Sequence, residues 1–481
     1  MQIRPIIWTA ILTLPLLAGC ERRIENPHLP EEDGLLRRWV PGGHIVQRED
    51  LGSNQLGIAR IQISPDWFAS TNAGKRFQST NSAPPYEVLV NTNGAMTVVL
   101  PRERHAAWRP SRTNRLAMAW PGIEFGVLEE YSLEKNVQIE ATYFLRAHDL
   151  EVGLLKRHRF DIAMVPGYIR LWEHERGHIM GIDRAKLNEF QHFEVASYFM
   201  NDTEPWEHLQ GIPYSWDILG LVFNEELRLD SAPSLSLIFN GTENAKLAGR
   251  TSLVSSARKL LGTALLHLGY DPNESDTNRI HEAGKLLKER KAQLNEEFPY
   301  RDHPSYEMLL QRKLLLSMSW ASTAAAYWHR DRADRDDGVQ LRFLPPTEGT
   351  IMEVEYIVMY RDNETYALVD YLLEPEVSAR VANGRFKAST SRAARRYIHR
   401  DVLQAIYGVL PRQMGSVHRQ LGVDDATWDL FDRIAYELNP DSGKPSHGGM
   451  NDYDDNRKHP HREDADEKEA HPANETSNGK E

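Results

Sequence analysis

Cysteine is almost absent from this sequence, because only Cys20 among its 481 residues carries a thiol. A single thiol excludes an intramolecular disulfide, so the fold must be stable without one. Long hydrophobic runs are also lacking: the apolar stretch at residues 6–17 is shorter than the roughly 20 residues that span a bilayer. Basic clusters with interleaved aromatics are missing, and the formal net charge is −12. Nucleic-acid binding therefore has little support, while the charge favours a cationic ligand.

The first twenty residues carry a pattern of their own. Arg4 precedes the apolar stretch, and small residues lead from it to Cys20. This order is typical of a secretory signal. Residues 17–20, which read LAGC, resemble the lipobox of bacterial lipoproteins, in which the cysteine is lipidated after cleavage. We therefore expect residues 1–20 to be a lipoprotein signal peptide and the mature protein to lie in the periplasm, anchored to a membrane through Cys20.

Changes of composition divide the rest of the chain. Residues 21–114 combine a polar tether with short apolar runs between turn residues, which predicts a β-rich extension with strands near 56–63, 86–90 and 94–100. From Arg115 onward strands alternate with helices, a pattern that indicates α/β layers around a largely parallel sheet. Residues 439–481 are poor in apolar side chains and rich in acidic residues, Asn, Pro and His. We expect this tail to be disordered.

Residues 160–190 allow two incompatible interpretations. In the first, His174 and His178 form an H-E-x-x-H pattern, with Asp183 shortly after it. On a continuous helix the two histidines would share a face and hold Zn²⁺, with Asp183 as third ligand and Glu175 as the base. The string resembles a metzincin pattern whose third ligand is an acid. This interpretation makes the protein a secreted zinc metallopeptidase.

In the second interpretation the same residues form a strand, a break and a helix. Residues 160–165 suit a buried strand, Pro166 breaks it, and a helix follows over 168–175. Gly177 then stands just past the helix end, where a positive φ is required. The two interpretations differ over one point of geometry, because a zinc site needs the helix to continue through His178.

The second interpretation resembles the polyamine-binding proteins of bacterial ABC importers. In that family a strand end of the type D-L/V-V-V-P-S leads through a helix to K-L-x-x-F/W, and residues 186–190 here read KLNEF. Other pieces of the resemblance follow in the family's order at residues 120–131, 212–224, 249–272, 314–321, 344–355, 363–377 and 386–395. Together they cover about residues 116–438. Several ordered pieces outweigh a single H-E-x-x-H pattern.

The resemblance implies an α/β fold of two lobes, the type II-like periplasmic binding protein fold, with a ligand in the cleft between them. It assigns residues 115–215 plus 350–438 to the first lobe and residues 216–349 to the second. The chain would cross between lobes at residues 212–224 and return at 344–355. Closure of the lobes around a ligand is the working motion of such proteins.

The resemblance also implies six ligand-binding residues: Trp120, Tyr168, Ser256, Trp320, Glu353 and Glu355. Glu355 falls on the position of the family's amine-binding aspartate, and Glu353 lies on the same face of the strand because side chains alternate. Facing solvent, the two carboxylates would be an ordinary surface pair. Facing a ligand, carboxylates and aromatic rings are what a buried ammonium group needs.

The chain departs from the family in a turn of the second lobe. The family's D-D-A-R-E type of turn reads SSARK here, at residues 255–259. A hydroxyl, that of Ser256, and a cation, that of Lys259, thus replace two carboxylates. One ammonium group of a bound diamine would therefore have no carboxylate to pair with in this turn. We therefore expect a cationic or zwitterionic ligand that is shorter than spermidine, or an amino-acid-like ligand whose carboxylate meets Arg258 or Lys259.

These observations predict the solute-binding component of an ABC transporter. It would capture a polyamine or related small amine and deliver it to a permease in the inner membrane, without enzymatic activity or a cofactor. Two alternatives stay open. One is the zinc metallopeptidase, with residues 317–319 (SMS) as an echo of its Met-turn. The other is a binding-protein scaffold that acts as a sensor or a structural partner.

Overall fold

The computed structural model describes four strands between residues 43 and 100 and, after them, residues 109–439. Gaps in the second part lie at residues 120–121, 145–149, 151–152, 155–159, 176, 196–198, 200–207, 230–232, 241–244, 297–299, 301–305, 327–340, 363 and 408–416. Cys20, Trp120 and the tail from residue 440 therefore lie outside the described residues. Among the described helices, none is both long and apolar enough to cross a membrane.

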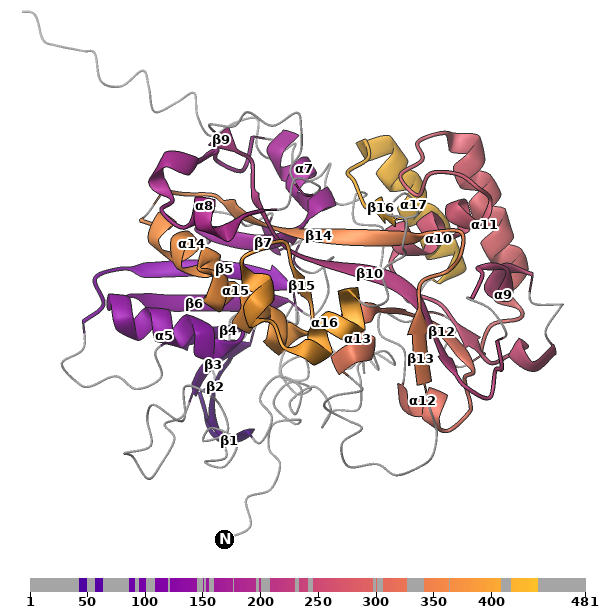
Figure 1. The fold of residues 1–481 in the computed structure, drawn as a ribbon, viewed down its shortest axis with the longest axis horizontal. Helices are drawn as coiled ribbons and strands as arrows, with labels where there is room; N and C mark the ends of the chain where they lie inside the picture. The colour runs from indigo at the N-terminus through magenta and orange to yellow at the C-terminus, as the bar shows by residue number, and fades with distance from the viewer. Residues whose placement is uncertain are drawn as a thin grey trace, which may run out of the picture.

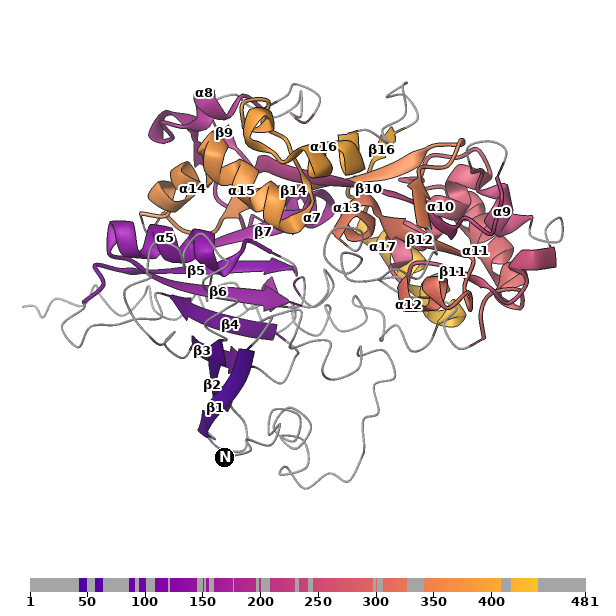
Figure 2. The same ribbon diagram turned by 60° about the horizontal axis from the view of Figure 1, so that its bottom comes forward.

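The N-terminal extension is an antiparallel row of strands that adds to the sheet of the first lobe. Its members are β1 (Gly43–Glu49), β2 (Gly57–Ile63), β3 (Tyr86–Val90) and β4 (Ala95–Leu100). Each pairs with the next, and β4 pairs antiparallel with β6 (Gln138–Phe144). Figure 2 shows these strands projecting from the edge of the larger sheet. The β-rich extension is confirmed, with strand bounds close to those expected.

The first lobe is built around parallel strands. β5 (Thr113–Ala119) lies between β6 and β7 (Ile162–Pro166) and runs parallel to both. Helix α5 (Phe125–Lys135) follows β5 in the chain, and Asn136 ends it with a φ of 52°. The helices α14 (Tyr366–Leu373) and α15 (Pro375–Arg385) return to this lobe late in the chain. Leu128, Leu368 and Leu372, all fully buried, join these helices to one core.

Two long strands connect the lobes. β10 (Ile212–Asn224) has 13 residues and β14 (Thr350–Met359) has 10, and every one of them is buried. They pair antiparallel with each other, and β14 also pairs antiparallel with β7. Figure 1 shows both running from one lobe into the other. The sheet is therefore mixed rather than largely parallel as predicted, because the crossing strands oppose the direction of their neighbours.

The second lobe lies at the far end of β10. Strands β12 (Leu316–Trp320) and β13 (Leu341–Leu344) pair antiparallel with β10, and β11 (Thr251–Ser252) pairs parallel with β12. Its helices are α9 (Ser236–Phe239), α10 (Ala257–His267), α11 (Thr277–Lys291), α12 (Tyr306–Leu310) and α13 (Ala321–Ala326). Leu260, Leu265, Ile280 and Leu316 belong to its core.

The last described helix, α17 (Asp425–Leu438), packs on the second lobe. Its residues Phe431 and Ile434 share a hydrophobic cluster with α10 and α11. Gly284 of α11 permits this close contact, since a Cβ there would lie 2.8 Å from Ile434. Residues 350–438 were expected in the first lobe, whereas α17, at Asp425–Leu438, packs on the second. The exact boundaries between the lobes stay a prediction.

Short elements complete the described chain: α7 (Gly167–Glu175), β8 (Ile182–Asp183), η3 (Arg184–Lys186), α8 (Phe190–Phe193), β9 (His208–Leu209), η5 (Ala245–Leu247), β15 (Ala388–Ser389), η7 (Ala394–Tyr397), α16 (Arg400–Ile406) and β16 (Val417–Arg419). Two of them touch the crossing strands directly. β15 pairs with β10 and β16 pairs with β14, so later parts of the chain hold the crossing strands in place.

Candidate ligand-binding site

The segment after β7 follows the second of the two interpretations. Strand β7 ends at Pro166, and α7 begins at Gly167 and ends at Glu175. Gly177 has a φ of 65°, and its amide donates to the carbonyl oxygen of His174 at 2.8 Å. The amide of His178 donates to the carbonyl oxygen of Glu173 at 2.9 Å. These are the hydrogen bonds that close a helix C-terminus around a left-handed residue, so the helix ends before His178.

The histidines consequently do not share a helix face. The His178 ring places its Nδ1 atom 3.4 Å from Oε1 of the buried Glu173. The Asp183 carboxylate accepts from the amide of Ala185 at 2.9 Å and caps a short helix. Within the part of the chain that the structure describes, no three His, Cys, Asp or Glu side chains are placed to hold a metal ion. The side chain of Glu175 lies outside that part.

Glu353 and Glu355 lie on the same face of β14, as the alternation of a strand requires, and both are buried. Glu353 is 7% exposed and Glu355 is 6% exposed. The surface-pair interpretation is therefore wrong. Opposite them on β10 lie Asp217, across from Glu353, and Ser215, across from Glu355. Directly opposed residues of an antiparallel pair share a face, so three carboxylates and a hydroxyl gather on one side of the crossing strands.

The carboxylate of Glu353 holds the ammonium group of Lys259. The Nζ atom of Lys259 lies 3.0 Å from Oε2 of Glu353 and 4.9 Å from the centre of the Trp320 ring. Lys259 comes from the first turn of α10 and is only 7% exposed, and Trp320 ends β12. A carboxylate and an aromatic face thus enclose one ammonium group. This is the arrangement that stabilises a desolvated cation.

Glu355 is held more completely, by two cations and a hydroxyl. Arg385 places Nη1 at 2.8 Å from Oε2 and donates from Nη2 to Oε1 at 2.9 Å. Lys387 donates from Nζ to Oε1 at 2.8 Å, and the Ser215 hydroxyl donates to Oε2. Burial alone would raise the pKa of Glu355, but the charges of Arg385 and Lys387 outweigh it and hold that pKa well below its usual range. Glu355 is therefore ionised at every physiological pH.

Asp217 is a part of this cluster that the sequence reasoning missed. It is 1% exposed, and its Oδ1 atom accepts from the amides of Ile218 at 2.9 Å and Ser322 at 3.2 Å. Its Oδ2 atom has no hydrogen-bond partner in the described chain. Burial raises the pKa of Asp217 to about 6. The signal in the sequence was a lone carboxylate within the otherwise apolar run of a crossing strand.

The remaining predicted residues lie around the start of α7 and α10. Tyr168 is buried and packs against Trp428 of α17, with ring centres 5.3 Å apart. Ser256 is the N-cap of α10 and makes no side-chain capping bond. Trp120 falls outside the described residues, so its place in the site stays a prediction. The structure thus brings Glu353 and Trp320 together around Lys259, and it places Tyr168 against the second-lobe helix α17.

Arg258 adds a second buried cation beside Lys259. It is 4% exposed, and its Nη2 atom donates to the carbonyl oxygen of Leu421 at 2.8 Å and to Oδ1 of Asn273 at 3.3 Å. Its Nε and Nη1 atoms have no hydrogen-bond partner among the described residues. Burial lowers the pKa of Arg258 to about 10, although Asp432 and Asp271 act in the opposite direction. A guanidinium with free donors suits a carboxylate.

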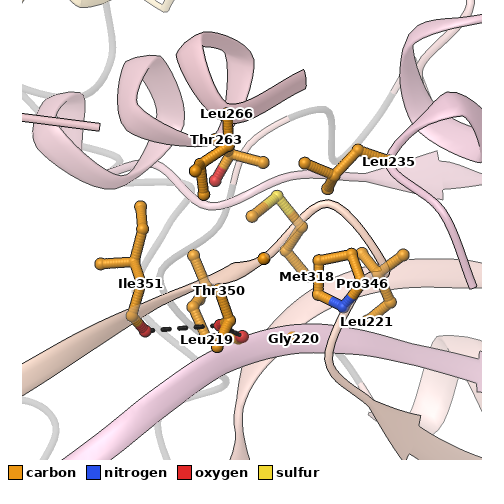
Figure 3. Close-up of a pocket in the computed structure, with 11 residues that line it drawn as sticks. Leu219, Gly220, Leu221, Leu235, Thr263, Leu266, Met318, Pro346, Thr350 and Ile351 are labelled. Carbon is orange, nitrogen blue, oxygen red and sulfur yellow. Dashed lines mark hydrogen bonds between the residues drawn. The ribbon is translucent and has the colours of Figure 1, made fainter. Parts of the chain in front are cut away.

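A small cavity lies next to the crossing strands in the second lobe, away from the predicted site. It has a volume of about 10 Å³ and is lined mostly by apolar side chains, including Leu219, Leu266 and Met318. Figure 3 shows these side chains around Thr350, whose hydroxyl donates to the carbonyl oxygen of Leu219. A volume near 10 Å³ holds about one water molecule. The predicted ligand-binding residues do not line this cavity.

No family model matches the chain, but curated proteins are similar to it at low identity. A putrescine/agmatine-binding protein of Pseudomonas aeruginosa is 23% identical over 243 residues, which are 48% of this chain and 65% of that protein. The spermidine/putrescine-binding periplasmic protein of Escherichia coli is 23% identical over 285 residues, which are 58% of this chain and 77% of that protein. The chain spans just under two thirds of the first relative.

Solved structures share the fold. The spermidine/putrescine ABC transporter substrate-binding protein PotD of Streptococcus pneumoniae superposes with a TM-score of 0.56 at 18% identity, covering 69% of this chain and all of that one. A PotD-type lipoprotein of Treponema pallidum gives a TM-score of 0.55 at 15% identity, covering 68% of this chain and 99% of that one. The two-lobe binding-protein fold is thereby confirmed, and so is the resemblance to polyamine-binding proteins. The name of the Pseudomonas aeruginosa relative describes binding of putrescine and agmatine, and that of the Streptococcus pneumoniae protein describes substrate binding for an ABC transporter.

Proposed function

We propose that this chain is the extracytoplasmic solute-binding component of an ABC transporter, and that it captures a polyamine or a related small amine between its lobes. Two observations support the proposal: the two-lobe fold, and relatives whose names state that they bind putrescine or spermidine. The loaded protein then delivers its solute to a permease in the inner membrane. Residues 1–20 direct export to the periplasm, and a lipid on Cys20 anchors the mature protein.

The observation that carries the proposal is the ammonium group held between Glu353 and Trp320. The Lys259 Nζ atom lies 3.0 Å from the carboxylate and 4.9 Å from the ring centre, which supports a cation-binding role for these two side chains. Glu353 lies on a strand that joins the lobes, and Trp320 ends a strand of the second lobe. Such a position lets a bound amine contact both lobes at once.

The cations of the site narrow the class of solute. Glu355 is already neutralised by Arg385 and Lys387, while Arg258 has two buried nitrogens without hydrogen-bond partners in the described chain. A second ammonium group that came close to Arg258 would be repelled. A carboxylate would supply the acceptors that Arg258 lacks. A solute with one amine and one acid group, of amino-acid type, therefore fits the second end of the site better than a long polyamine does.

Thermal unfolding of the full chain in mild detergent tests the proposal. Putrescine, spermidine and a panel of amino acids are added one at a time, with Zn²⁺ as a further probe. A solute that binds only the folded state adds about 2.7 kcal/mol of stability at a concentration of 100 times its Kd. We expect at least one amine-bearing solute to raise the melting temperature.

The site dependence of that shift is tested with two aromatic substitutions. Trp320→Ala removes the aromatic face and should weaken binding by roughly tenfold, since a desolvated cation–π contact contributes about 1–2 kcal/mol. Tyr397→Ala, at an aromatic residue that is 38% exposed and away from the site, should leave binding unchanged. If no amine or amino acid shifts the melting temperature at millimolar concentration, the proposal is wrong.

A second candidate function is a binding-protein scaffold that acts as a sensor or structural partner without an amine ligand. The internal ion pairs favour it, because Glu353 and Glu355 already have partners from their own chain. Under this alternative no small amine changes the melting temperature, while the fold is intact. The thermal panel therefore separates the two candidates.

A further inference from the structure

We infer that the side chain of Lys259 is a tethered ammonium that occupies the amine subsite formed by Glu353 and Trp320, so that a solute amine must displace it in order to bind. The inference rests on the proposed function and adds a residue that sets its specificity. Lys259 lies in the turn at residues 255–259, where the resembling family has an acidic pair.

The geometry around Lys259 is that of a bound ligand rather than of a surface ion pair. Its side chain and that of Glu353 are each 9% exposed, and the ammonium group also lies over the Trp320 ring. In a surface pair such as Lys288 with Glu437, both side chains are more than half exposed. An exposed pair contributes about 0–1 kcal/mol, which would not hold a long side chain in one buried position.

The backbone of α10 fixes where the side chain starts. Lys259 stands in the first turn, where its amide donates to the carbonyl oxygen of Ser256 at 3.1 Å. Its own carbonyl oxygen accepts from the hydroxyl of Thr263 at 2.8 Å. Both the amide and the carbonyl oxygen of Lys259 are therefore fixed by hydrogen bonds. The four-carbon stem is left to carry the ammonium group to Glu353.

A tethered group competes strongly with a free solute. Its effective concentration is on the order of millimolar or higher, because the helix holds it near the subsite at all times. A free monoamine below that concentration cannot displace it. A solute with a second group that binds elsewhere between the lobes gains a contact that a simple amine lacks. Lys259 thus selects against simple amines and for solutes with a second recognised group.

If Lys259 and Glu353 form only a structural ion pair, a variant without the lysine should respond differently to a free cation than if Lys259 fills an amine subsite. Removing the cation from either one leaves a buried carboxylate without a partner and lowers stability. Only a subsite then accepts a free cation in its place. A propylammonium ion has the atoms that Lys259 carries beyond Cβ, so it matches the space that Lys259→Ala would leave.

The test is rescue of the Lys259→Ala variant, in the full chain, by n-propylammonium chloride. We expect the substitution to lower the melting temperature and the added ion to restore it with a saturable dose dependence. The wild-type chain should show no such response. Sodium chloride at equal ionic strength and n-propanol are the matched probes, and neither should restore stability.

Three variants sharpen the result. Lys259→Met keeps most of the stem and leaves no room, so it should not be rescued. The double variant with Lys259→Ala and Glu353→Gln should not be rescued either, because the carboxylate is gone. Lys288→Ala breaks the exposed pair with Glu437 and should show neither loss nor rescue. If Lys259→Ala does not fold alone, propylammonium must recover folded protein during refolding.

The outcomes separate this inference from the proposed function. Absence of saturable rescue in Lys259→Ala, or equal rescue in Lys259→Met, overturns the inference even if the wild type binds an amine. Rescue of Lys259→Ala together with a wild type that binds no amine supports the inference and rejects amine capture by the native chain. Rescue together with binding of an amine by the wild type supports both.

Discussion

Asp217 and Glu355 are buried carboxylates on the same face of the crossing strands, yet their surroundings act on them in opposite directions. Arg385 and Lys387 both lie within 3.0 Å of the Glu355 carboxylate, which keeps its charge stable. Asp217 accepts two backbone hydrogen bonds, and its Oδ2 atom has no hydrogen-bond partner in the described chain. Desolvation favours the neutral acid, and here it outweighs the charge of Lys387, which acts in the opposite direction. The ionisation of Asp217 therefore lowers the stability of the fold.

We predict that Asp217→Asn stabilises the protein at neutral pH and not at acidic pH. The pKa of Asp217 is raised from 3.8 to about 6, so between these values the folded state binds the proton more tightly than the unfolded chain does. Stability therefore falls as the pH rises from about 4 to 6, and the loss is complete above that range. The amide can still accept from Ile218 and Ser322. The free energy of unfolding at pH 7.5 should rise by about 1–3 kcal/mol.

Guanidinium unfolding at several pH values between 4 and 8 measures this prediction. The gain over the wild type should shrink toward zero as the pH approaches 4. Glu437→Gln is the control, because that carboxylate is exposed and paired with Lys288. A gain of equal size at all pH values would mean that the amide stabilises for another reason and that Asp217 does not titrate as proposed.

The end of α7 decides between the two interpretations of the H-E-x-x-H pattern. Gly177 has a φ of 65°, and a Cβ added there would meet no atom within 4 Å. There is therefore room for a side chain at residue 177, and only the left-handed backbone conformation disfavours one. In an α-helix running on through His178, Gly177 would instead be an interior residue. The two interpretations thus predict stability changes of opposite sign when Gly177 is replaced by alanine.

Gly177→Ala should destabilise the protein by roughly 1–2 kcal/mol, because a residue with a Cβ is strained at that backbone conformation. If the helix continued, the same change would stabilise it by about 1 kcal/mol, since alanine is the better helix former. Gly177→Asn is the matched variant, because asparagine tolerates the left-handed region and should lose less. Urea unfolding of the three proteins provides the comparison, and a more stable Gly177→Ala would contradict the structure.

Patterns along the chain predicted most individual elements. The strand expected at residues 160–165 is observed at Ile162–Pro166, and the helix expected at 168–175 is observed at Gly167–Glu175. The crossing expected at residues 212–224 is strand β10. Local periodicity and turn residues suffice there, because each element depends on neighbours in sequence. The direction of the crossing strands does not follow from local pattern. It depends on pairing between β10 and β14, which are more than a hundred residues apart.

The partners of the site residues were beyond local reasoning for the same reason. The carboxylates Glu353 and Glu355 were expected to face a ligand, and Arg258 or Lys259 was expected to meet the carboxylate of an amino-acid-like solute. In the structure Lys259 pairs with Glu353 across 94 residues, and Arg385 with Glu355 across 30. Residue type showed that charged groups would meet in this region. Which cation neutralises which carboxylate is set by how α10 and α15 pack against the crossing strands.

Besides the crossing strands that join the lobes, an aromatic contact between Tyr168 and Trp428 connects them. Tyr168 follows a first-lobe strand, while Trp428 stands on α17, which packs against α10 and α11 of the second lobe. Their rings are 5.3 Å apart, close enough for an aromatic pair to contribute about 0.5–1.5 kcal/mol beyond its buried area. Two-lobe binding proteins close by rigid-body motion of their lobes, and a contact that is present in only one arrangement shifts the balance between arrangements.

We predict that Trp428→Leu increases the separation of the lobes in the absence of a solute. The change removes the ring that meets Tyr168 and keeps an apolar side chain on α17. Phe431→Leu is the matched control, because Phe431 is also a buried aromatic of α17 but belongs to the second-lobe cluster. It should alter stability and leave the separation of the lobes unchanged.

Spin labels on the two lobes measure that separation by pulsed electron resonance. Cys20 is the only cysteine of the chain, so Cys20→Ser gives a background without thiols. Cysteines introduced at Leu133 of α5, which is 37% exposed, and at Lys285 of α11, whose side chain is 77% exposed, carry the labels. A longer mean distance between the labels in Trp428→Leu alone supports the conclusion that the contact between Tyr168 and Trp428 holds the lobes together. Identical distance distributions in all three proteins would show that the contact between Tyr168 and Trp428 does not determine the separation of the lobes.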